Sequence, residues 1–354
     1  MFFISDNGGP VPDAVLTALA AANTGHAMPY GKDALTAQAV AQIRTVFEAP
    51  DALVHFVATG TAANALALAS LAHPWQAIFA HEGAHILRDE CNAPEFFTGG
   101  AKIVGLPGAA GRIDPAAFKA ALAQFASQDG TDTDAGPLSL TNVTECGTVY
   151  DPDQVSQLAG MARAHGIATH MDGARFANAV AALGCTPAEL TWKSGVDALS
   201  FGGTKNGLLG VEAVIFFNPD AAQALARRRK RAGHLFSKSR YLAAQMLAYT
   251  QDDLWLSLAR DANAAASRLE QVLADSPDAT LIHPREANMV FARLPAHQHA
   301  RLRAAGATYY LQAPDSAVSG PRDVMLGARL VCNWATTGTD IEGFANALKA
   351  PEFP

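Results

Sequence analysis

Two short apolar runs are each followed by a charged residue, in the segments HMDGAR at residues 170–175 and SFGGTKNG at residues 200–207. Such runs, bounded by small and polar residues, are typical of buried strands, here Ile167–Met171 and Ala198–Phe201. Asp172 and Lys205 then lie just beyond the carboxyl ends of two strands. Because open α/β sheets bind ligands at that edge, the pair predicts a shared site.

The chemistry of this pair has to be weighed against simpler interpretations. Lys205 alone fits a strand-end lysine that reaches solvent, and Asp172 alone fits a turn or helix cap. However, the glycines around Lys205 leave room for a bulky group, and burial would lower the pKa of its amine and favour a Schiff base. Asp172 would pair with a protonated pyridine nitrogen. Together the two residues favour a pyridoxal-type site over either simple interpretation.

A third segment, Thr59-Gly60-Thr61, joins a predicted strand at Leu53–Ala58 to an alanine-rich helix at Ala62–Ala72. The first backbone N–H groups of a helix form a natural binding site for phosphate. The segment is weak evidence alone, because many α/β proteins contain one GxG-like turn. Beside Asp172 and Lys205 it predicts the missing phosphate site.

The wider pattern alternates short apolar strands with helices, which predicts an α/β fold with a mainly parallel sheet covered by helices. Residues 127–136 are expected to form a polar loop. After about residue 219 the pattern becomes strongly helical, and a smaller C-terminal α/β unit follows. We expect a large domain at residues 1–250, including the N-terminal segment, and a small domain at residues 251–354.

Composition excludes several classes of protein. The 354 residues carry a formal net charge of −7, which argues against a nucleic-acid partner. The basic run at residues 227–231 is best explained as a solvated helix face, with a nucleic-acid patch or a role near an anionic cofactor as alternatives. The four cysteines are scattered and predict neither a metal site nor a disulfide framework. With no membrane-spanning run or signal peptide expected, a cytoplasmic location is the default prediction.

The order of motifs resembles a known family. ATGTAAN at 58–64, HEGAH at 81–85, HMDGAR, SFGGTKN and GARLVCNW at 327–334 together resemble the low-specificity L-threonine aldolases. These are fold-type-I pyridoxal-phosphate enzymes of the β-eliminating-lyase group. The resemblance extends over nearly the whole chain and implies a homo-oligomer, a dimer or tetramer, with shared active sites.

The resemblance also implies residue roles. Lys205 would hold pyridoxal 5′-phosphate covalently, Asp172 would bind the pyridine nitrogen, and His85 would stack on the ring and take part in proton transfer. The phosphate would be bound by Thr59, Gly60 and Thr61. The substrate carboxylate would be bound by Ser5, Arg175 and Arg329, of which Arg175 also approaches the cofactor. Without the resemblance, each arginine would more simply form a surface ion pair.

Two departures from the family pattern bear on these roles. Relatives often carry a histidine where this chain has Glu145, so Glu145 becomes a candidate for proton transfer with the substrate hydroxyl. The alternative is that it caps a turn or pairs with an arginine. Burial would raise the pKa of Glu145 and a nearby Arg175 would lower it, and the sequence does not rank these two effects. Relatives also place a phosphate-binding arginine near residues 233–238, where Lys238 is the replacement and would reach the neighbouring subunit's site. Tyr30 is a second candidate for a cross-subunit contact, with core packing as the alternative.

The reaction implied is cleavage of L-threonine, L-allo-threonine or related β-hydroxy-α-amino acids, such as phenylserine, to glycine and an aldehyde. Another pyridoxal-phosphate lyase or a transaminase of the same fold is the alternative activity, and a non-catalytic binding protein is the alternative class. The absence of GxGxxG after the first strand counts against a nicotinamide-dependent dehydrogenase.

Overall fold

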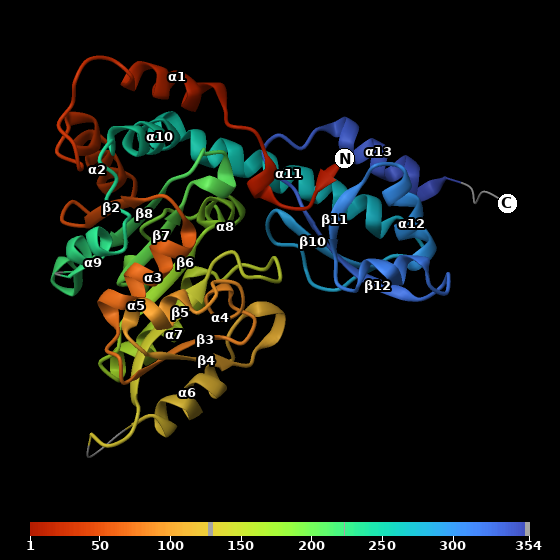
Figure 1. The fold of residues 1–354 in the computed structure, drawn as a ribbon. Helices are drawn as coiled ribbons and strands as arrows, with labels where there is room; N and C mark the ends of the chain where they lie inside the picture. Colours follow the sequence, from red (N-terminus) through yellow and green to blue (C-terminus); the bar gives the residue numbers. More distant parts are fainter. Residues whose placement is uncertain (127–129, 223, 351–354) are drawn as a thin grey trace.

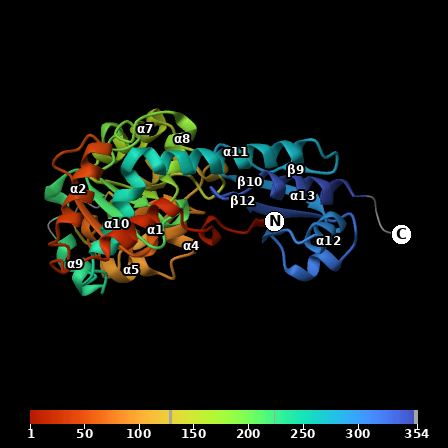
Figure 2. The ribbon, with the colours of Figure 1, turned by 90° about the horizontal axis from the view of Figure 1, so that it is seen from above.

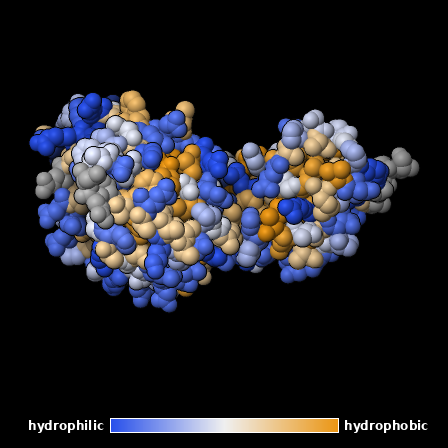
Figure 3. All heavy atoms as spheres, turned by 90° about the horizontal axis from the view of Figure 1, so that it is seen from below, coloured by the Kyte–Doolittle hydropathy of each residue, from blue (hydrophilic) through white to orange (hydrophobic). Residues whose placement is uncertain are grey.

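The computed structural model describes residues 1–126, 130–222 and 224–350, arranged as a large and a small body (Figure 1). Each body is built on one sheet. The large body contains a seven-stranded sheet in the order β2-β8-β7-β6-β5-β3-β4, and the small body a five-stranded sheet in the order β1-β11-β12-β10-β9. Figure 3 shows the narrow waist that joins them.

The large sheet is parallel apart from β8, which runs antiparallel to both β7 and β2. The predicted fold class, a mainly parallel sheet with a smaller α/β unit, is confirmed. β8 reverses direction because only residues 203–211 separate it from β7, too few for a crossover helix. The strands are β2 (Leu53–Val57), β3 (Gln76–His81), β4 (Lys102–Leu106), β5 (Asp134–Thr141), β6 (Thr169–Gly173), β7 (Ala198–Gly202) and β8 (Glu212–Phe216).

Helices cover both faces of this sheet (Figures 1 and 2). The helix α3 is apolar almost all round, and every residue from 62 to 69 is buried, as expected for a helix enclosed on all sides. Helix α7 begins at a capping box made by Asp151 and Gln154. The helices of the large body are α1 (Asp13–Ala22), α2 (Ala34–Val46), α3 (Gly60–Leu71), α4 (His85–Arg88), α5 (Ala93–Thr98), α6 (Pro115–Gln124), α7 (Pro152–Ala164), α8 (Phe176–Leu183), α9 (Leu225–Arg231) and α10 (Arg240–Thr250).

The small body takes in both ends of the described chain. The two-residue strand β1 (Phe2–Phe3) pairs in parallel with β11, so the chain begins in the small body before entering the large one. The long helix α11 (Leu254–Ala274) runs between the bodies (Figure 2). The other elements are β9 (Thr280–Leu281), β10 (Met289–Pro295), α12 (Ala296–Ala304), β11 (Thr308–Leu311), β12 (Met325–Val331) and α13 (Gly338–Lys349). The domain boundary near residue 250 stays a prediction.

The predicted C-terminal boundary of the polar loop at residues 127–136 was wrong. Residues 127–129 lie outside the described residues, but β5 already begins at Asp134. Gly136 makes this possible, because a Cβ there would lie 2.7 Å from the carbonyl oxygen of Ala77 on the neighbouring strand. The pairing of β3 with β5 shifts register between Ala77 and Phe79, where glycine and proline are tolerated.

The basic run in α9 is only partly a solvated face. Arg228 donates to the carbonyl oxygen of Phe97 at 3.2 Å, and Arg229 to that of Phe56 at 3.3 Å. These two arginines fasten α9 to the large body. The exposed residues of the run, including Arg227 and Arg231, keep the expected solvated position.

The core below the site is built around Phe201, the fourth residue of β7. Its ring lies 5.3 Å from that of Phe47 and 5.6 Å from that of Trp255, both in edge-to-face geometry. We predict that Phe201→Ala lowers the free energy of unfolding by about 3–5 kcal/mol, because it leaves a cavity in this cluster. Denaturant unfolding would measure the loss.

The matched control is Phe96→Ala, since Phe96 is 77% exposed. That change should stay within about 0.5 kcal/mol of the wild type. Equal effects of the two substitutions would contradict the role of Phe201.

Candidate active site

Two adjoining cavities open at the carboxyl ends of β6 and β7, with volumes of about 260 and 280 Å³. Asn7, His85, Asp172, Ala174 and Lys205 line both. We name the first the threonine cavity, which is also lined by Ala58, Thr59, Gly60, Thr61, Asn64, Glu90, Thr204 and Glu212. The second is the arginine cavity, also lined by Ser5, Gly83, Arg88, Asp89, Thr141, Val143, Glu145, Arg175, Met289 and Arg329.

Asp172 lies near the end of β6 and is buried. One carboxylate oxygen, Oδ1, accepts the backbone N–H of Ala174 at 3.0 Å, and the other accepts the side-chain amide of Asn64 at 2.9 Å. These two donors come from different elements, the turn after β6 and helix α3. They fix the orientation of the carboxylate at the boundary of the two cavities.

Lys205 lies in a short 3-10 turn, Thr204–Asn206, directly after β7. Asn206 anchors this turn, since its amide donates to the hydroxyl of Tyr249 and to the carbonyl of Trp255, both at 2.8 Å. Burial lowers the pKa of the Lys205 amine below its ordinary value, and the neighbouring charge of Arg175 lowers it further. A larger share of the amine is therefore neutral and nucleophilic than for an exposed lysine.

The glycines before Lys205 have a different role from the one expected. A Cβ on Gly202 would lie 2.4 Å from the carbonyl oxygen of Ala174, and one on Gly203 would lie 2.6 Å from that of Val211. They allow neighbouring backbone segments to approach closely, and the space that they leave is already filled by the protein. The expectation that they make room for a bulky ligand was wrong.

The segment Thr59–Thr61 forms the start of α3, as predicted from its position between a strand and a helix. The Thr59 side chain accepts the N–H of Ala62 at 3.2 Å, which leaves the N–H groups of Gly60 and Thr61 without a partner inside the helix. A Cβ on Gly60 would meet nothing within 4 Å. This end of the threonine cavity is thus open and lined by backbone donors, which suits a phosphate group.

The two predicted arginines differ in their surroundings. Arg175 is held by Asp6, with Nε at 2.6 Å and Nη2 at 3.0 Å from the two carboxylate oxygens. Burial alone would raise the pKa of Asp6, but the charges of Arg175 and Lys205 outweigh it and lower that pKa. Arg329 is freer: within the described chain its buried Nε has no partner, and its Nη2 makes only a 3.5 Å contact with the carbonyl of Ile4. Ser5 lines the same cavity and caps the turn at Asp6–Gly8.

Glu145 follows β5 and reaches the arginine cavity. Its Oε1 accepts the backbone N–H of His85 at 2.6 Å, and its buried Oε2 has no partner among the described residues. Burial, with a further contribution from the charge of Asp172, raises the pKa of Glu145 to about 7, against the opposing effects of the His85 N–H and Arg175. The sequence left the balance of these effects open, and the structure places it on the raised side.

The remaining predicted residues fall into two groups. His85 begins α4 and lines both cavities, with its Nδ1 3.2 Å from Asp89. Tyr30 and Lys238 line neither cavity of this chain. Tyr30 is 45% exposed, and the Nζ of Lys230 lies 4.9 Å from its ring centre, while Lys238 is exposed. Their expected contact with a neighbouring subunit stays a prediction.

Three buried polar residues of the threonine cavity were not predicted from the sequence: Asn64, Glu90 and Glu212. Asn64 and Glu212 had a usable signal, because each is a polar residue in an otherwise apolar helix or strand. Glu90 follows α4 in a polar turn and gives no such signal.

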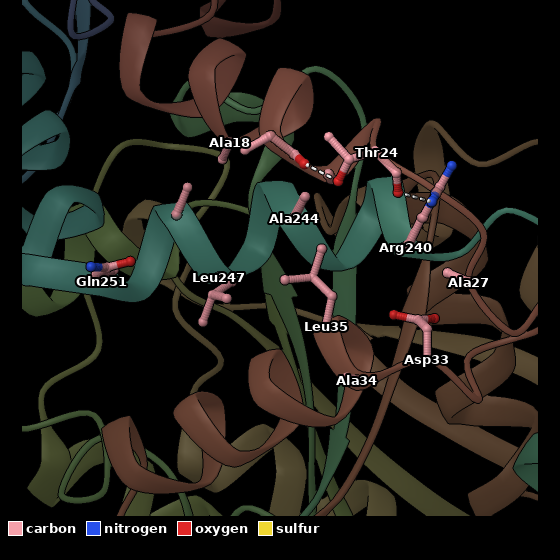
Figure 4. Close-up of a pocket in the computed structure, with 13 residues that line it drawn as sticks. Ala18, Thr24, Ala27, Asp33, Ala34, Leu35, Arg240, Ala244, Leu247 and Gln251 are labelled. Carbon is pink, nitrogen blue, oxygen red and sulfur yellow. Dashed lines mark hydrogen bonds between the residues drawn. The ribbon is translucent and has the colours of Figure 1, made fainter.

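A third hollow lies away from this chemistry, between α1, α2 and α10 (Figure 4). Its lining is mainly alanine and leucine, and Arg240 at its rim donates to the carbonyls of Thr24 and Gly25. Within residues 1–126, 130–222 and 224–350 no cluster of three or more metal-binding side chains occurs. In the same part of the chain, no helix has the length and apolar character needed to cross a membrane.

Comparison with known proteins identifies the family. The model of the beta-eliminating lyases matches residues 3–296. The chain belongs to this family. It is 42% identical to the low specificity L-threonine aldolase of Pseudomonas aeruginosa, over 96% of this chain and 94% of that one. The same named enzyme from a Pseudomonas species is 39% identical over 98% and 97%.

A solved structure agrees with these relatives. The threonine aldolase of Leishmania major superposes with a TM-score of 0.90 at 27% identity, over 98% of both chains. The predicted lyase class, the resemblance to the threonine aldolases and the pyridoxal phosphate cofactor are confirmed by these matches. So is an amino-acid substrate.

Proposed function

We propose that this chain cleaves L-threonine, L-allo-threonine and related β-hydroxy-α-amino acids to glycine and an aldehyde. The observation that carries the proposal is the position of Lys205, whose low-pKa amine borders both cavities. A cofactor attached there would be held with its phosphate by the threonine cavity, and the arginine cavity would take the substrate. The names of the relatives, all threonine aldolases, support the same substrate class.

The residues present fit pyridoxal phosphate. Thr59, Gly60 and Thr61 would hold the phosphate with the open backbone donors of α3, and Asp172 would hold the pyridine nitrogen. His85 borders both cavities and would cover one face of the ring. When bound, the cofactor supplies an electron sink for the bond that breaks at the substrate's Cα.

Arg329 would bind the substrate carboxylate. Its guanidinium has the donors to spare, stacks on Tyr310 at 5.1 Å and comes from the small body, so substrate binding would draw on both bodies. Ser5 would add a hydroxyl at the same end. Since Asp6 already occupies two of the five N–H donors of Arg175, the role of Arg175 would be to use its remaining donors toward substrate or cofactor.

Glu145 would accept the proton of the substrate's β-hydroxyl as a general base. In its carboxylate form the free Oε2 can accept this proton as the Cα–Cβ bond breaks and the carbonyl of the aldehyde forms. The protonated Glu145 can return the proton to solvent after the aldehyde leaves. The N–H of His85 keeps Oε1 occupied and so directs Oε2 to this task.

The attachment site gives the first test. We expect purified protein to absorb in the visible, and borohydride reduction followed by peptide mapping to place the cofactor on Lys205. Lys205→Ala should lose covalent attachment but still bind the cofactor through Asp172 and Thr59–Thr61. Label on another lysine would remove Lys205 from the proposed role.

The role of Glu145 is tested by its pH profile. Because the carboxylate is the active form and its pKa is about 7, kcat/KM of the wild type should rise as pH increases through 7. Glu145→Gln should flatten this rise and lower kcat for L-threonine by about 10²–10⁴-fold. Cofactor absorbance should stay normal in the variant. A kinetically silent Gln would shift proton transfer to His85, to the phosphate or to water.

The active unit would be a homo-oligomer with shared sites. The threonine cavity is lined by three carboxyls, and Lys205 is its only lysine or arginine within the described residues. A phosphate dianion therefore calls for a further cation, which Lys238 of a second copy would supply beside Tyr30.

Subunit complementation tests this sharing. Lys205→Ala and Lys238→Ala should each lose activity, whereas co-expression should restore about a quarter of the wild-type level. The reason is that half of randomly paired symmetric dimers are mixed, and each mixed dimer has one intact site. No recovery on mixing, or a fully active monomer by light scattering, would contradict the shared site.

A further inference from the structure

Three buried carboxyls line the threonine cavity: Glu90, Asp172 and Glu212. The proposed ligand of this cavity carries a phosphate dianion. Three carboxylates and a phosphate in one buried space would repel one another strongly, because charges interact strongly where water is excluded. A neutral carboxyl would reduce this repulsion when the cofactor is bound, in addition to the positive charge that Lys238 of a second copy would supply.

The hydrogen-bond donors around the three carboxyls indicate which one. Asp172 accepts from the N–H of Ala174 and from Asn64, and Glu212 accepts from the N–H of Gly203 at 2.6 Å. Backbone donors of this kind stabilise a carboxylate. Glu90 has no backbone donor: its Oε1 accepts from the side chain of Asn64, at 3.0 Å, and the Thr61 hydroxyl is the other side-chain donor near its carboxyl.

Asn64 links Glu90 to the cofactor end of the site. Its amide nitrogen donates to Glu90 Oε1 and to Asp172 Oδ2, which uses both of its hydrogens. The negative charge of an ionised Glu90 would thus lie one side chain away from Asp172. A neutral Glu90 leaves Asp172 as the only anion of this pair, and the buried Oε2 of Glu90 can carry the proton.

We infer that Glu90 is a positioning residue whose protonation is linked to cofactor binding: the threonine cavity takes up a proton at Glu90 when pyridoxal phosphate enters. This inference rests on the proposed cofactor site. It adds a carboxyl that neither contacts the reacting bond nor belongs to the motifs that resemble the family.

The other charges that face Glu90 set the direction of the linkage. Burial, and then the charge of Asp172, raises the pKa of Glu90 to about 7, while Asn64, Lys205 and the Thr61 hydroxyl oppose this. Glu212 and His85 line the same cavity. An entering cofactor adds the phosphate charge and removes water, both of which raise the pKa further, and these effects outweigh the single positive charge at the ring nitrogen.

The pH dependence of cofactor affinity follows from this rise in pKa. When the pKa of a group is higher in the bound protein than in the free protein, its contribution to affinity is complete at pH values below the free pKa. That contribution is lost as the pH rises above the free pKa. Cofactor affinity should therefore weaken above about pH 7 through Glu90. Between pH 6 and pH 8 the loss should be about tenfold.

The test uses the full-length apoprotein and 4′-deoxypyridoxine 5′-phosphate, which lacks the aldehyde and cannot react with Lys205. Titration calorimetry at pH 6 and pH 8, in buffers of different ionisation enthalpy, gives both Kd and proton uptake. Glu90→Gln keeps the acceptor for Asn64 and imitates the neutral acid. The ratio of Kd at pH 8 to Kd at pH 6 should be about tenfold larger in the wild type than in this variant. Proton uptake at pH 8 should be larger in the wild type by about one.

Glu212→Gln is the matched control, since Glu212 is also a buried carboxyl of this cavity whose pKa is raised by burial to about 7. It differs from Glu90 in accepting a backbone N–H, that of Gly203, which would hold its carboxylate form when the phosphate enters. Glu212→Gln should retain the wild-type pH ratio. Equal ratios in wild type and Glu90→Gln, loss of the effect in Glu212→Gln instead, or a folded Glu90→Gln that binds at neither pH would each overturn the inference. A wild-type protein that does not bind the analogue at all would instead overturn the cofactor site itself.

Discussion

The site depends on keeping one lysine amine away from water at the end of a buried strand. The pKa of Lys205 is lowered by its burial and by the charge of Arg175. These two effects outweigh the carboxyls of Asp6, Asp172 and Glu212, which favour the charged form of the amine. Burial of this kind needs a closely packed turn. Gly202 and Gly203 allow the backbone of neighbouring segments to approach, and Asn206 ties the turn to α10 and α11 through Tyr249 and Trp255. The core around Phe201 supports the same strand from below.

The two bodies are joined through the site itself. Asp6, which leads out of the small sheet, binds Arg175 after β6 in the large body and also accepts the amide of Asn288 at 3.1 Å, just before β10. Arg329 comes from β12 of the small sheet. A relative movement of the bodies would therefore change the distance between the proposed carboxylate-binding group and Lys205. The substrate side of the site, which includes Arg329, is therefore complete only when the small body is docked against the large one.

The sequence predicted those parts of the site that follow from strand order. Asp172, Lys205 and Thr59 each stand at the end of a predicted strand, and strand ends of a parallel sheet share one edge, so their meeting followed from the pattern. Asn64 reaches both Asp172 and Glu90 only because α3 is buried beside α5 and the sheet, which no local sequence pattern predicts. The glycines before Lys205 were expected to leave room for a bulky group, whereas they allow neighbouring backbone segments to approach. For Glu145 the competing effects on its pKa depend on distances, and only the structure provides these.

The titratable groups of the site act on one another. A neutral Glu90 removes one of the counter-charges that would stabilise the ammonium form of Lys205, and a neutral Lys205 in turn favours a neutral Glu90. The charge of Asp172 also helps to raise the pKa of Glu145. The charge of Asp172 thus contributes to the raised pKa of both Glu90 and Glu145. A positively charged ring nitrogen beside Asp172 would weaken that contribution. Cofactor binding would thereby change the proton balance on both sides of the site, which is a physical reason for one aspartate to lie between the phosphate side and the substrate side.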